Sequence, residues 1–220
     1  MRENATEGYI NTCQASKVGD AIQPAYLDGI MAATLISEAI TYYETGKYRD
    51  ALERYNSALE LPAGNQLRVL NGLYLTSLKL GRQAAADAAF GKIVDHGLAN
   101  NRLAVKFLFR PGSTGFITDR QLSAPYPFWL KEIARRAAQK NSCLEIIGHT
   151  SPTGPEPLNE RLSLLRAEVI KKNLEDLAPS LNGRTIATGK GSRENLIGSG
   201  KDDLSDSLDR RVVFSVIACA

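Results

Sequence analysis

The first half of the chain has apolar residues spaced as on the buried faces of helices, and the spacing repeats. From about residue 20 to residue 96 the pattern has a period of 35 residues. The repeated positions are Gly46, Ala51, Tyr55, Ala58 and Leu59, followed by Gly81, Ala86, Phe90, Ile93 and Val94. The pattern predicts helices at residues 29–45, 48–60, 66–80 and 83–95, with a shorter helix around residues 22–27 that caps the stack.

The second half of the chain changes to the short apolar runs that are typical of strands. They predict strands at residues 103–109, 144–150, 185–188 and 209–217, with helices at residues 127–140 and 157–177 between them. The inward positions of the first of these helices are Leu130, Ile133, Ala134 and Ala137. The order βαβαββ predicts an α+β protein in which a mixed sheet follows an all-α region.

The change of pattern near residue 100 predicts a domain boundary. A chain of 220 residues is long enough for two hydrophobic cores. We therefore expect a flexible leader at residues 1–19, a helical domain at residues 20–99 and a sheet domain at residues 103–220.

The helix predicted at residues 157–177 has a mixed surface. Pro157 suits the first helical position because its missing N–H would have no partner there. The apolar face, which we expect to be buried, consists of Leu158, Leu162, Leu165 and Val169. The neighbouring stripe consists of Asn159, Ser163 and Arg166, and it can reach the loop that follows the strand at residues 144–150. At such a rim Arg166 is either a receptor for a carboxylate or one half of a structural ion pair.

The strand end before this helix, the helix itself and the start of the last strand resemble the signature of the OmpA-like peptidoglycan-binding domain. The matching residues are Gly148, His149 and Thr150 at the strand end, Gly154 in the loop, Asn159, Leu162, Ser163, Arg166 and Ala167 on the helix, and Arg210, Arg211 and Val212 in the last strand. Ser151 stands where the family motif has aspartate, and Asp209 stands where it has asparagine. The resemblance covers about half of the chain and implies the same βαβαββ order.

The resemblance implies a site for the diaminopimelate of the peptidoglycan stem peptide. Family members hold this group mainly with the motif aspartate and the helix arginine, which correspond to Ser151 and Arg166. The site residues expected here are Thr150, Ser151, Asn159, Leu162, Arg166 and Arg211, with the turn at residues 110–115 at the border. Because a serine hydroxyl brings no charge, we expect weaker binding or selectivity for a modified stem peptide, unless Glu156 or an acid from residues 202–206 supplies the carboxylate.

The first helical repeat, with Tyr42, Tyr48 and Pro62, resembles a tetratricopeptide repeat. A small residue lets two helices approach and an aromatic residue fills the gap between them. Two repeats are fewer than a free-standing solenoid normally has, so we expect them to lean on the leader or on the second domain. The resemblance implies either a surface for a protein partner or a spacer and dimerisation element.

Composition excludes several classes of protein. No run of 18 apolar residues exists, so no transmembrane segment is predicted. Residues 1–5 do not have the pattern of a signal peptide, and residues 10–13 do not resemble a lipoprotein cleavage box. The formal net charge of +3 is too small to indicate a nucleic-acid partner.

No catalytic or metal-binding set is present in the sequence. The cysteines at positions 13, 143 and 219 and the two histidines do not have metal-ligand spacing, so we expect no metal and no cofactor. Cys143 and Cys219 could form a disulfide if their strands are neighbours. Neither Ser151 nor Ser163 has a histidine and carboxylate at a suitable spacing, and His149 is expected to hydrogen-bond the loop rather than to act as a base.

The resemblance to the OmpA-like domain implies a peptidoglycan-binding protein of the Gram-negative cell envelope, and the missing catalytic set predicts that it is non-enzymatic. It is expected in the periplasm, associated with the cell wall or outer membrane, where it would anchor or link the envelope to the wall through the diaminopimelate of the stem peptide. One alternative is an envelope scaffolding protein whose OmpA-like domain has lost or altered glycan binding. Another is an enzyme acting on peptidoglycan, against which the missing catalytic set argues.

Overall fold

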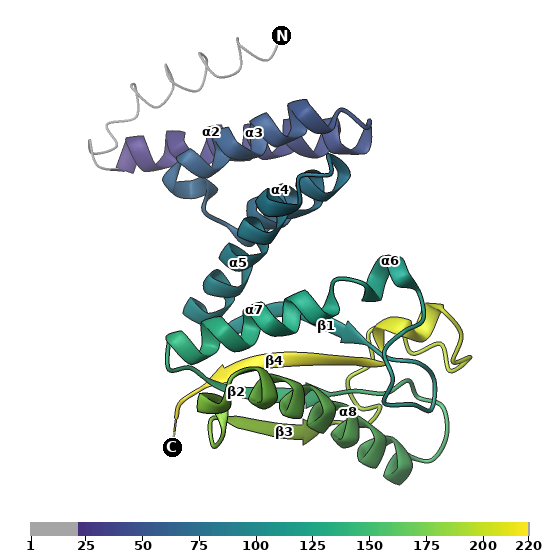
Figure 1. Ribbon diagram of the computed structural model, residues 1–220. Coiled ribbons are helices and arrows are strands. Elements are labelled where there is room, and N and C mark those ends of the chain that lie inside the picture. Colours follow the sequence, from purple (N-terminus) through teal and green to yellow (C-terminus); the bar gives the residue numbers. More distant parts are fainter. Residues whose placement is uncertain (1–21, 220) are drawn as a thin grey trace. The chain divides into compact units, whose positions relative to one another are not determined.

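The computed structural model describes residues 22–219 (Figure 1), so the leader expected at residues 1–19 lies outside the described residues. These residues divide into two compact units, the first ending at Lys92 and the second beginning at Ile93. The division lies inside helix α5 (Gln83–Ala99), whose last turns therefore belong to the second unit. A joint between separable domains near residues 97–103 remains a prediction.

The first unit consists of α-helices joined by short turns. They are α2 (Ile22–Glu44), α3 (Tyr48–Glu60), α4 (Leu67–Lys79) and the start of α5, with a single 3-10 turn, η1 (Pro62–Gly64), before α4. Gly46 and Gly81 end α2 and α4 with φ of +77° and +68°, a backbone conformation that favours glycine. The prediction of a separate helix at residues 22–27 is wrong, because α2 continues through Gly29 at a cost of only about 1 kcal/mol.

Seven of the ten repeated positions are buried, and two of these seven, Ile93 and Val94, belong to the second unit. The ring of Tyr55 packs against Gly72, where an added Cβ would come within 2.3 Å of the ring. Tyr74 and Phe90 join α4 to α5 with ring centroids 5.7 Å apart. The buried repeat positions are Ala51, Tyr55, Ala58, Ala86, Phe90, Ile93 and Val94. The small-against-aromatic packing expected of the repeat is present, while the tetratricopeptide character itself remains a prediction.

The second unit is built on a four-stranded mixed sheet. Its strands are β1 (Arg102–Leu108), β2 (Cys143–Gly148), β3 (Thr185–Gly189) and β4 (Arg211–Ile217), in the spatial order β1-β4-β2-β3. The β2–β3 pair is parallel, and β4 is antiparallel to both β1 and β2. The helices are α6 (Arg120–Ser123), α7 (Tyr126–Gln139) and α8 (Glu156–Leu177), with single turns η2 (Pro179–Leu181) and η3 (Ser205–Leu208). The predicted α+β class and the βαβαββ order are confirmed.

Helices α7 and α8 cover the same face of this sheet (Figure 1). Phe107 of β1 contacts Phe214 of β4 and Tyr126 of α7. Phe214 pairs with Ile146 of β2, and two residues further along β2 a Cβ added at Gly148 would lie 1.9 Å from a backbone oxygen of α8. Glycine at position 148 therefore lets α8 approach the end of the strand closely.

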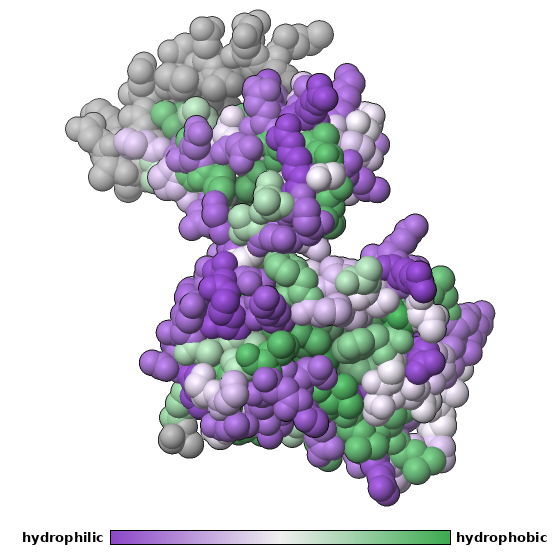
Figure 2. Space-filling view, in the orientation of Figure 1, coloured by the Kyte–Doolittle hydropathy of each residue, from purple (hydrophilic) through white to green (hydrophobic). Residues whose placement is uncertain are grey.

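The buried face of α8 differs from the predicted one. Leu158 is 64% exposed and Leu165 is 40% exposed, whereas the buried residues are Asn159, Ser163, Arg166, Ala167, Ile170 and Leu174. The leucine-rich face was assigned to the core because of its hydrophobicity, but the close approach at Gly148 turns the polar stripe toward the sheet. Apolar surface is visible over the amino-terminal half of α8 in Figure 2. The inward positions predicted for α7 are all buried.

A disulfide joins Cys143 to Cys219, with the two Cα atoms 5.3 Å apart. This pairing is possible because Cys143 stands opposite Ile217 in the antiparallel β2–β4 pair. It ties the carboxyl end of the chain to the start of β2. Within residues 22–219, no helix has the length and apolar character needed to cross a membrane.

Candidate functional site

The segment that follows β2 lies where several loops of the second unit converge. The backbone N–H of His149 donates to the carbonyl oxygen of Arg211 at 2.8 Å, and that of Thr150 donates to the carbonyl oxygen of Gly191 at 2.9 Å. The side chain of Asn195 donates to the carbonyl oxygen of Thr150 at 2.8 Å. Residues 149–151 are therefore enclosed by the loop that connects β3 to β4 and by the start of β4.

Arg166 is fully buried and joins this junction to the turn after β1. Its guanidinium donates to the carbonyl oxygens of Arg110, Ser113 and His149 at 2.8, 2.9 and 3.0 Å. It also lies 5.4 Å from the ring centroid of Phe109. The structure thus gives Arg166 neither a position at an open rim nor a carboxylate in direct contact, because its acceptors are backbone carbonyls.

The charge of Arg166 persists in this buried position. Burial and, next, the positive charge of Arg210 lower its pKa to about 10, while Asp202 acts in the opposite direction. A guanidinium with this pKa is protonated at neutral pH. Two of its three carbonyl partners belong to the turn at residues 110–115.

Ser151 is next to a carboxylate that comes from the loop before β4. The Ser151 hydroxyl donates to Oδ1 of Asp202 at 2.7 Å. The same Oδ1 accepts a hydrogen bond from Nη1 of Arg210 at 2.8 Å. Arg210 is itself nearly buried, and it also donates to the carbonyl oxygens of Phe109 and Asp203. A carboxylate therefore lies beside position 151, although position 151 is not an acid.

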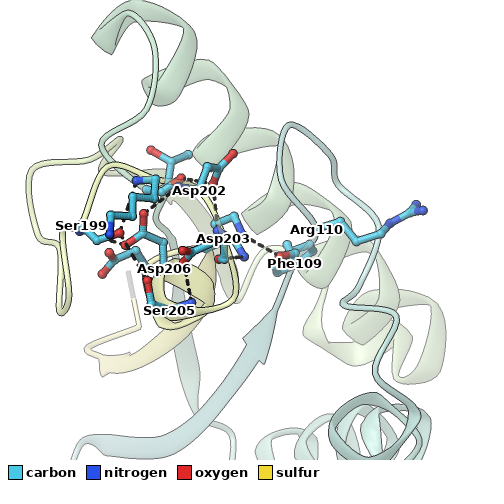
Figure 3. Close-up of polar contacts among 12 residues, drawn as sticks. Phe109, Arg110, Ser199, Asp202, Asp203, Ser205 and Asp206 are labelled. Carbon is cyan, nitrogen blue, oxygen red and sulfur yellow. Dashed lines mark hydrogen bonds and ion pairs between the residues drawn. The ribbon is translucent and has the colours of Figure 1, made fainter.

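Buried Asp206 fixes the backbone of the loop that carries Asp202. It accepts hydrogen bonds from the backbone N–H groups of Ser199 at 2.9 Å and of Asp202 at 3.0 Å. Burial alone would raise the pKa of Asp206, but these hydrogen bonds and the nearby Arg210 lower it. Figure 3 shows this acidic loop, with the side chain of Arg110 extending away from it.

Asp209 holds the preceding part of the same loop. Its carboxylate accepts hydrogen bonds from three consecutive backbone N–H groups, those of Leu196, Ile197 and Gly198. Burial again acts to raise its pKa, and the three backbone hydrogen bonds outweigh it, so the pKa lies below the usual value. An acid at this position is thus explained by the anchoring of the loop.

His149 and Thr150 bring buried polar atoms that lack hydrogen-bond partners. Among the described residues, the two ring nitrogens of His149 and the hydroxyl of Thr150 have no hydrogen-bond partner. Glu194 is the nearest carboxylate, 3.9 Å from Nδ1 of His149. Burial, and then the charge of Arg211, lower the pKa of His149 to about 4, so the ring is neutral at pH 7. The expected hydrogen bond from the His149 side chain to the loop is absent from the described residues.

The other residues expected in the site lie around this junction rather than at Asp202. Asn159 is buried and its amide donates to the carbonyl oxygen of Gly154 at 3.4 Å. Leu162 is half-buried on α8. Arg211 donates to the carbonyl oxygens of Leu208 and Glu194 at 3.3 and 3.1 Å. The neighbouring Arg210, which was noted only as part of a motif, is the arginine that contacts Asp202.

A shallow hollow elsewhere on α8 contains none of the expected site residues. It is lined by Pro157, Glu160, Arg161, Leu164, Gly189 and Arg193. The hydroxyl of Ser163 donates to the carbonyl oxygen of Glu160 and accepts the N–H of Gly191, so it has a structural role. In the described part of the chain, no group of three His, Cys, Asp or Glu side chains could hold a metal ion.

From the sequence, Asp202 was expected only as one of several acids in residues 202–206 that could supply a carboxylate, and no role was predicted for Asp209. A clearer signal was available in the segment Asp202–Asp206, which contains three acids and is followed a few residues later by two arginines, Arg210 and Arg211. What the sequence cannot supply is the path of a loop that brings Asp202 back to a residue 51 positions earlier in the chain.

Part of the chain is similar to known proteins. The model of the OmpA family matches residues 108–207. The peptidoglycan-associated lipoprotein from Burkholderia pseudomallei is 20% identical, with 51% of this chain and 89% of that chain covered and a TM-score of 0.44. The carboxyl-terminal domain of Helicobacter pylori MotB is 20% identical, with coverages of 53% and 86% and a TM-score of 0.41. The cell wall anchor of the T6SS from Pseudomonas aeruginosa is 20% identical, with coverages of 59% and 96% and a TM-score of 0.40.

No curated protein matches the chain. The family match includes the strand end, the loop and all of α8, with the residues that surround Arg166. It therefore covers the predicted motif apart from the last strand. Residues 108–207 form an OmpA-like domain, and the OmpA family is a non-enzymatic family of peptidoglycan-binding domains.

Proposed function

We propose that this protein anchors or links the cell envelope to the cell wall by binding peptidoglycan through the junction at the carboxyl end of β2. The observation that carries the proposal is a charged guanidinium and a carboxylate, those of Arg166 and Asp202, which are both hydrogen-bonded to residues 149–151 in an OmpA-like domain. A pair of opposite charges of this kind suits a ligand that has both an ammonium and a carboxylate.

The ligand class is the diaminopimelate of the stem peptide, with Thr150, Ser151, Asn159, Leu162, Arg166 and Arg211 in or around the site. A ligand carboxylate reaches Arg166 only when the turn at residues 110–115 moves, because this turn supplies the carbonyls of Arg110 and Ser113. The ligand carboxylate then replaces neutral acceptors with a charged one, and charge-assisted hydrogen bonds are the stronger kind.

The location proposed is the periplasm, in association with the cell wall or outer membrane. The Cys143–Cys219 disulfide supports this, because disulfides persist in oxidising compartments. The helical unit is proposed to be a tetratricopeptide-like spacer or a surface for a protein partner.

A second candidate function is an envelope scaffold whose OmpA-like domain has lost or altered glycan binding. The observation that favours it is the complete burial of Arg166, whose guanidinium is already engaged by three backbone carbonyls. On this view Arg166 stabilises the fold and the junction binds no ligand.

Sedimentation of the full chain with purified sacculi separates the two candidates. Sacculi rich in diaminopimelate are compared with sacculi from which an amidase has removed the stem peptides. The proposed function predicts that the chain pellets with intact sacculi, that a free stem tripeptide releases it, and that stripped sacculi bind much less. Equal pelleting with both preparations would contradict stem-peptide binding, and no pelleting with either would favour the scaffold.

A further inference from the structure

The Asp202 carboxylate is held in place through one oxygen. Oδ1 accepts hydrogen bonds from the Ser151 hydroxyl at 2.7 Å and from Arg210 at 2.8 Å. The backbone of Asp202 is also fixed, because its N–H donates to Asp206 and its φ is +55°, a conformation that aspartate tolerates better than most residues. This aspartate is therefore positioned before any ligand arrives.

The second oxygen of Asp202 is available to a ligand. Oδ2 has no hydrogen-bond partner among residues 22–219, and the side chain is 26% exposed. Ser151 and Arg210, by contrast, are almost completely buried beneath it. A carboxylate with one oxygen anchored and the other accessible is a preorganised acceptor for an N–H donor.

The charges around Asp202 restrict what kind of donor it accepts. Arg166 and Arg210 are both buried cations near Asp202, and His149 is neutral. A simple cation approaching Asp202 is repelled by these two guanidinium groups. A group that carries a carboxylate next to its ammonium is not, because its own carboxylate faces the cations.

We propose that Asp202 is the residue that binds the ammonium group of the ligand's zwitterionic amino-acid end, so that a carboxylate from the loop before β4 acts where position 151 has only a hydroxyl. In this arrangement Ser151 is a positioning residue that orients Asp202. The inference rests on the proposed function, since it names the ammonium partner of the same stem-peptide site.

Titration of the full chain with two stem tripeptides ending in diaminopimelate tests this role. One tripeptide has a free distal ammonium, and in the other this amine is acetylated. The wild type should bind the free form about tenfold more tightly, the factor that corresponds to about 1.4 kcal/mol. Asp202→Asn should reduce the ratio of the two affinities to about one.

Asp203→Asn is the matched control, because it removes the same charge from a neighbouring side chain whose only hydrogen-bond partner among residues 22–219 is Ser205. It should keep the wild-type ratio. If Asp202→Asn weakened both tripeptides equally, or kept the preference for the free ammonium, Asp202 would be merely the structural partner of Arg210 and the inference would be overturned. Thermal unfolding of each variant verifies that the fold is retained.

Moving the carboxylate gives a second test. Ser151→Asp alone places two carboxylates within hydrogen-bond distance, so it should not increase the preference for the free ammonium, whereas Ser151→Asp combined with Asp202→Asn should restore it. A rise in preference with Ser151→Asp alone would overturn the inference.

The wild type itself distinguishes the inference from the proposed function. Equal binding of both tripeptides by the wild type would overturn the inference and leave the proposed function intact. A wild type that binds neither tripeptide nor sacculi would refute both.

Discussion

At the scale of single residues, the buried side chains of the second unit explain why its polar motif is not simply a ligand surface. Arg166 donates to three carbonyl oxygens from two segments that are far apart in the sequence, those of Arg110 and Ser113 in the turn after β1 and that of His149 after β2. A lysine has a single ammonium on a flexible stem and cannot reproduce this planar set of donors. The guanidinium thus organises the junction whether or not a ligand also uses it.

Replacing Arg166 by Met should therefore lower the free energy of unfolding by about 3–5 kcal/mol, because three buried carbonyls lose their donors. Arg166→Lys should cost less, since it keeps a charge and some of the donors. Denaturant unfolding measures both variants, with Arg161→Met on the exposed side of α8 as the control. A free energy of unfolding for Arg166→Met equal to that of the wild type would contradict the structural role.

His149 should make the stability of the second unit depend on pH. Its pKa is about 4 in the folded protein and near 6.5 in the unfolded chain, so the unfolded chain binds the proton more readily. The stabilisation is complete above pH 6.5 and is lost as the pH falls toward 4, by up to about 3 kcal/mol. His149→Gln should flatten unfolding curves recorded between pH 6.5 and 4; an unchanged pH profile in His149→Gln would show that another group is responsible.

At the scale of elements, the sequence predicted the strands and helices but not which side of α8 is buried. Leucine spacing identified the length of the helix, and it assigned Leu158 and Leu165 to the core, where the structure does not place them. The deciding contact is between α8 and the strand end at Gly148, which depends on tertiary packing and not on the periodicity of the helix. In the same way, the local pattern predicted that one helix ends before Gly29 and another begins there, whereas α2 is a single helix through this residue.

The loop before β4 is the other element that sequence could not position. Its acids are visible in the sequence, but Asp206 and Asp209 are bonded to backbone N–H groups of the loop itself, which follow from its fold. Asp209 binds three such groups, so it determines the conformation of residues 196–198. We infer that the position of Asp202 depends on this anchoring.

Asp209→Asn tests the anchoring of the loop. An amide has only one acceptor oxygen, and its NH₂ group would face the N–H of Gly198, so at least one hydrogen bond is lost. We expect a loss of about 1–3 kcal/mol in unfolding free energy and faster hydrogen exchange at the amides of residues 196–198. Asp203→Asn, whose carboxylate bonds only Ser205, should leave those exchange rates unchanged; unaltered exchange in Asp209→Asn would mean that the loop is held by other contacts.

At the scale of the whole molecule, the chain consists of two compact units whose boundary lies within α5. The last turns of this helix belong to the second unit. There Asp95 forms ion pairs with Arg136 of α7 and with Lys140, the residue that follows α7. The sequence predicted the change from helical repeat to sheet, because periodicity is a local property. It could not predict that the end of one predicted element is part of the next unit.

Limited proteolysis should leave a folded fragment of residues 103–220. A fragment of residues 93–220 keeps Asp95 and should be slightly more stable, by less than about 1 kcal/mol for partly exposed ion pairs. Circular dichroism and thermal unfolding of the two purified fragments measure this. If the fragment of residues 103–220 did not fold while the longer one did, the end of α5 would be an essential part of the second unit.

The central claim is that an OmpA-like domain in this chain binds the stem peptide at the end of β2. Titration of the isotope-labelled full chain with a stem tripeptide ending in diaminopimelate, followed by amide chemical shifts, tests it most directly. The account predicts saturable shifts at residues 149–151, in the turn at residues 110–115 and around Asp202, with α2 and α3 unaffected. Shifts confined to the helical unit, or to the hollow beside Leu164 and Arg193, or no shifts at all, would contradict it.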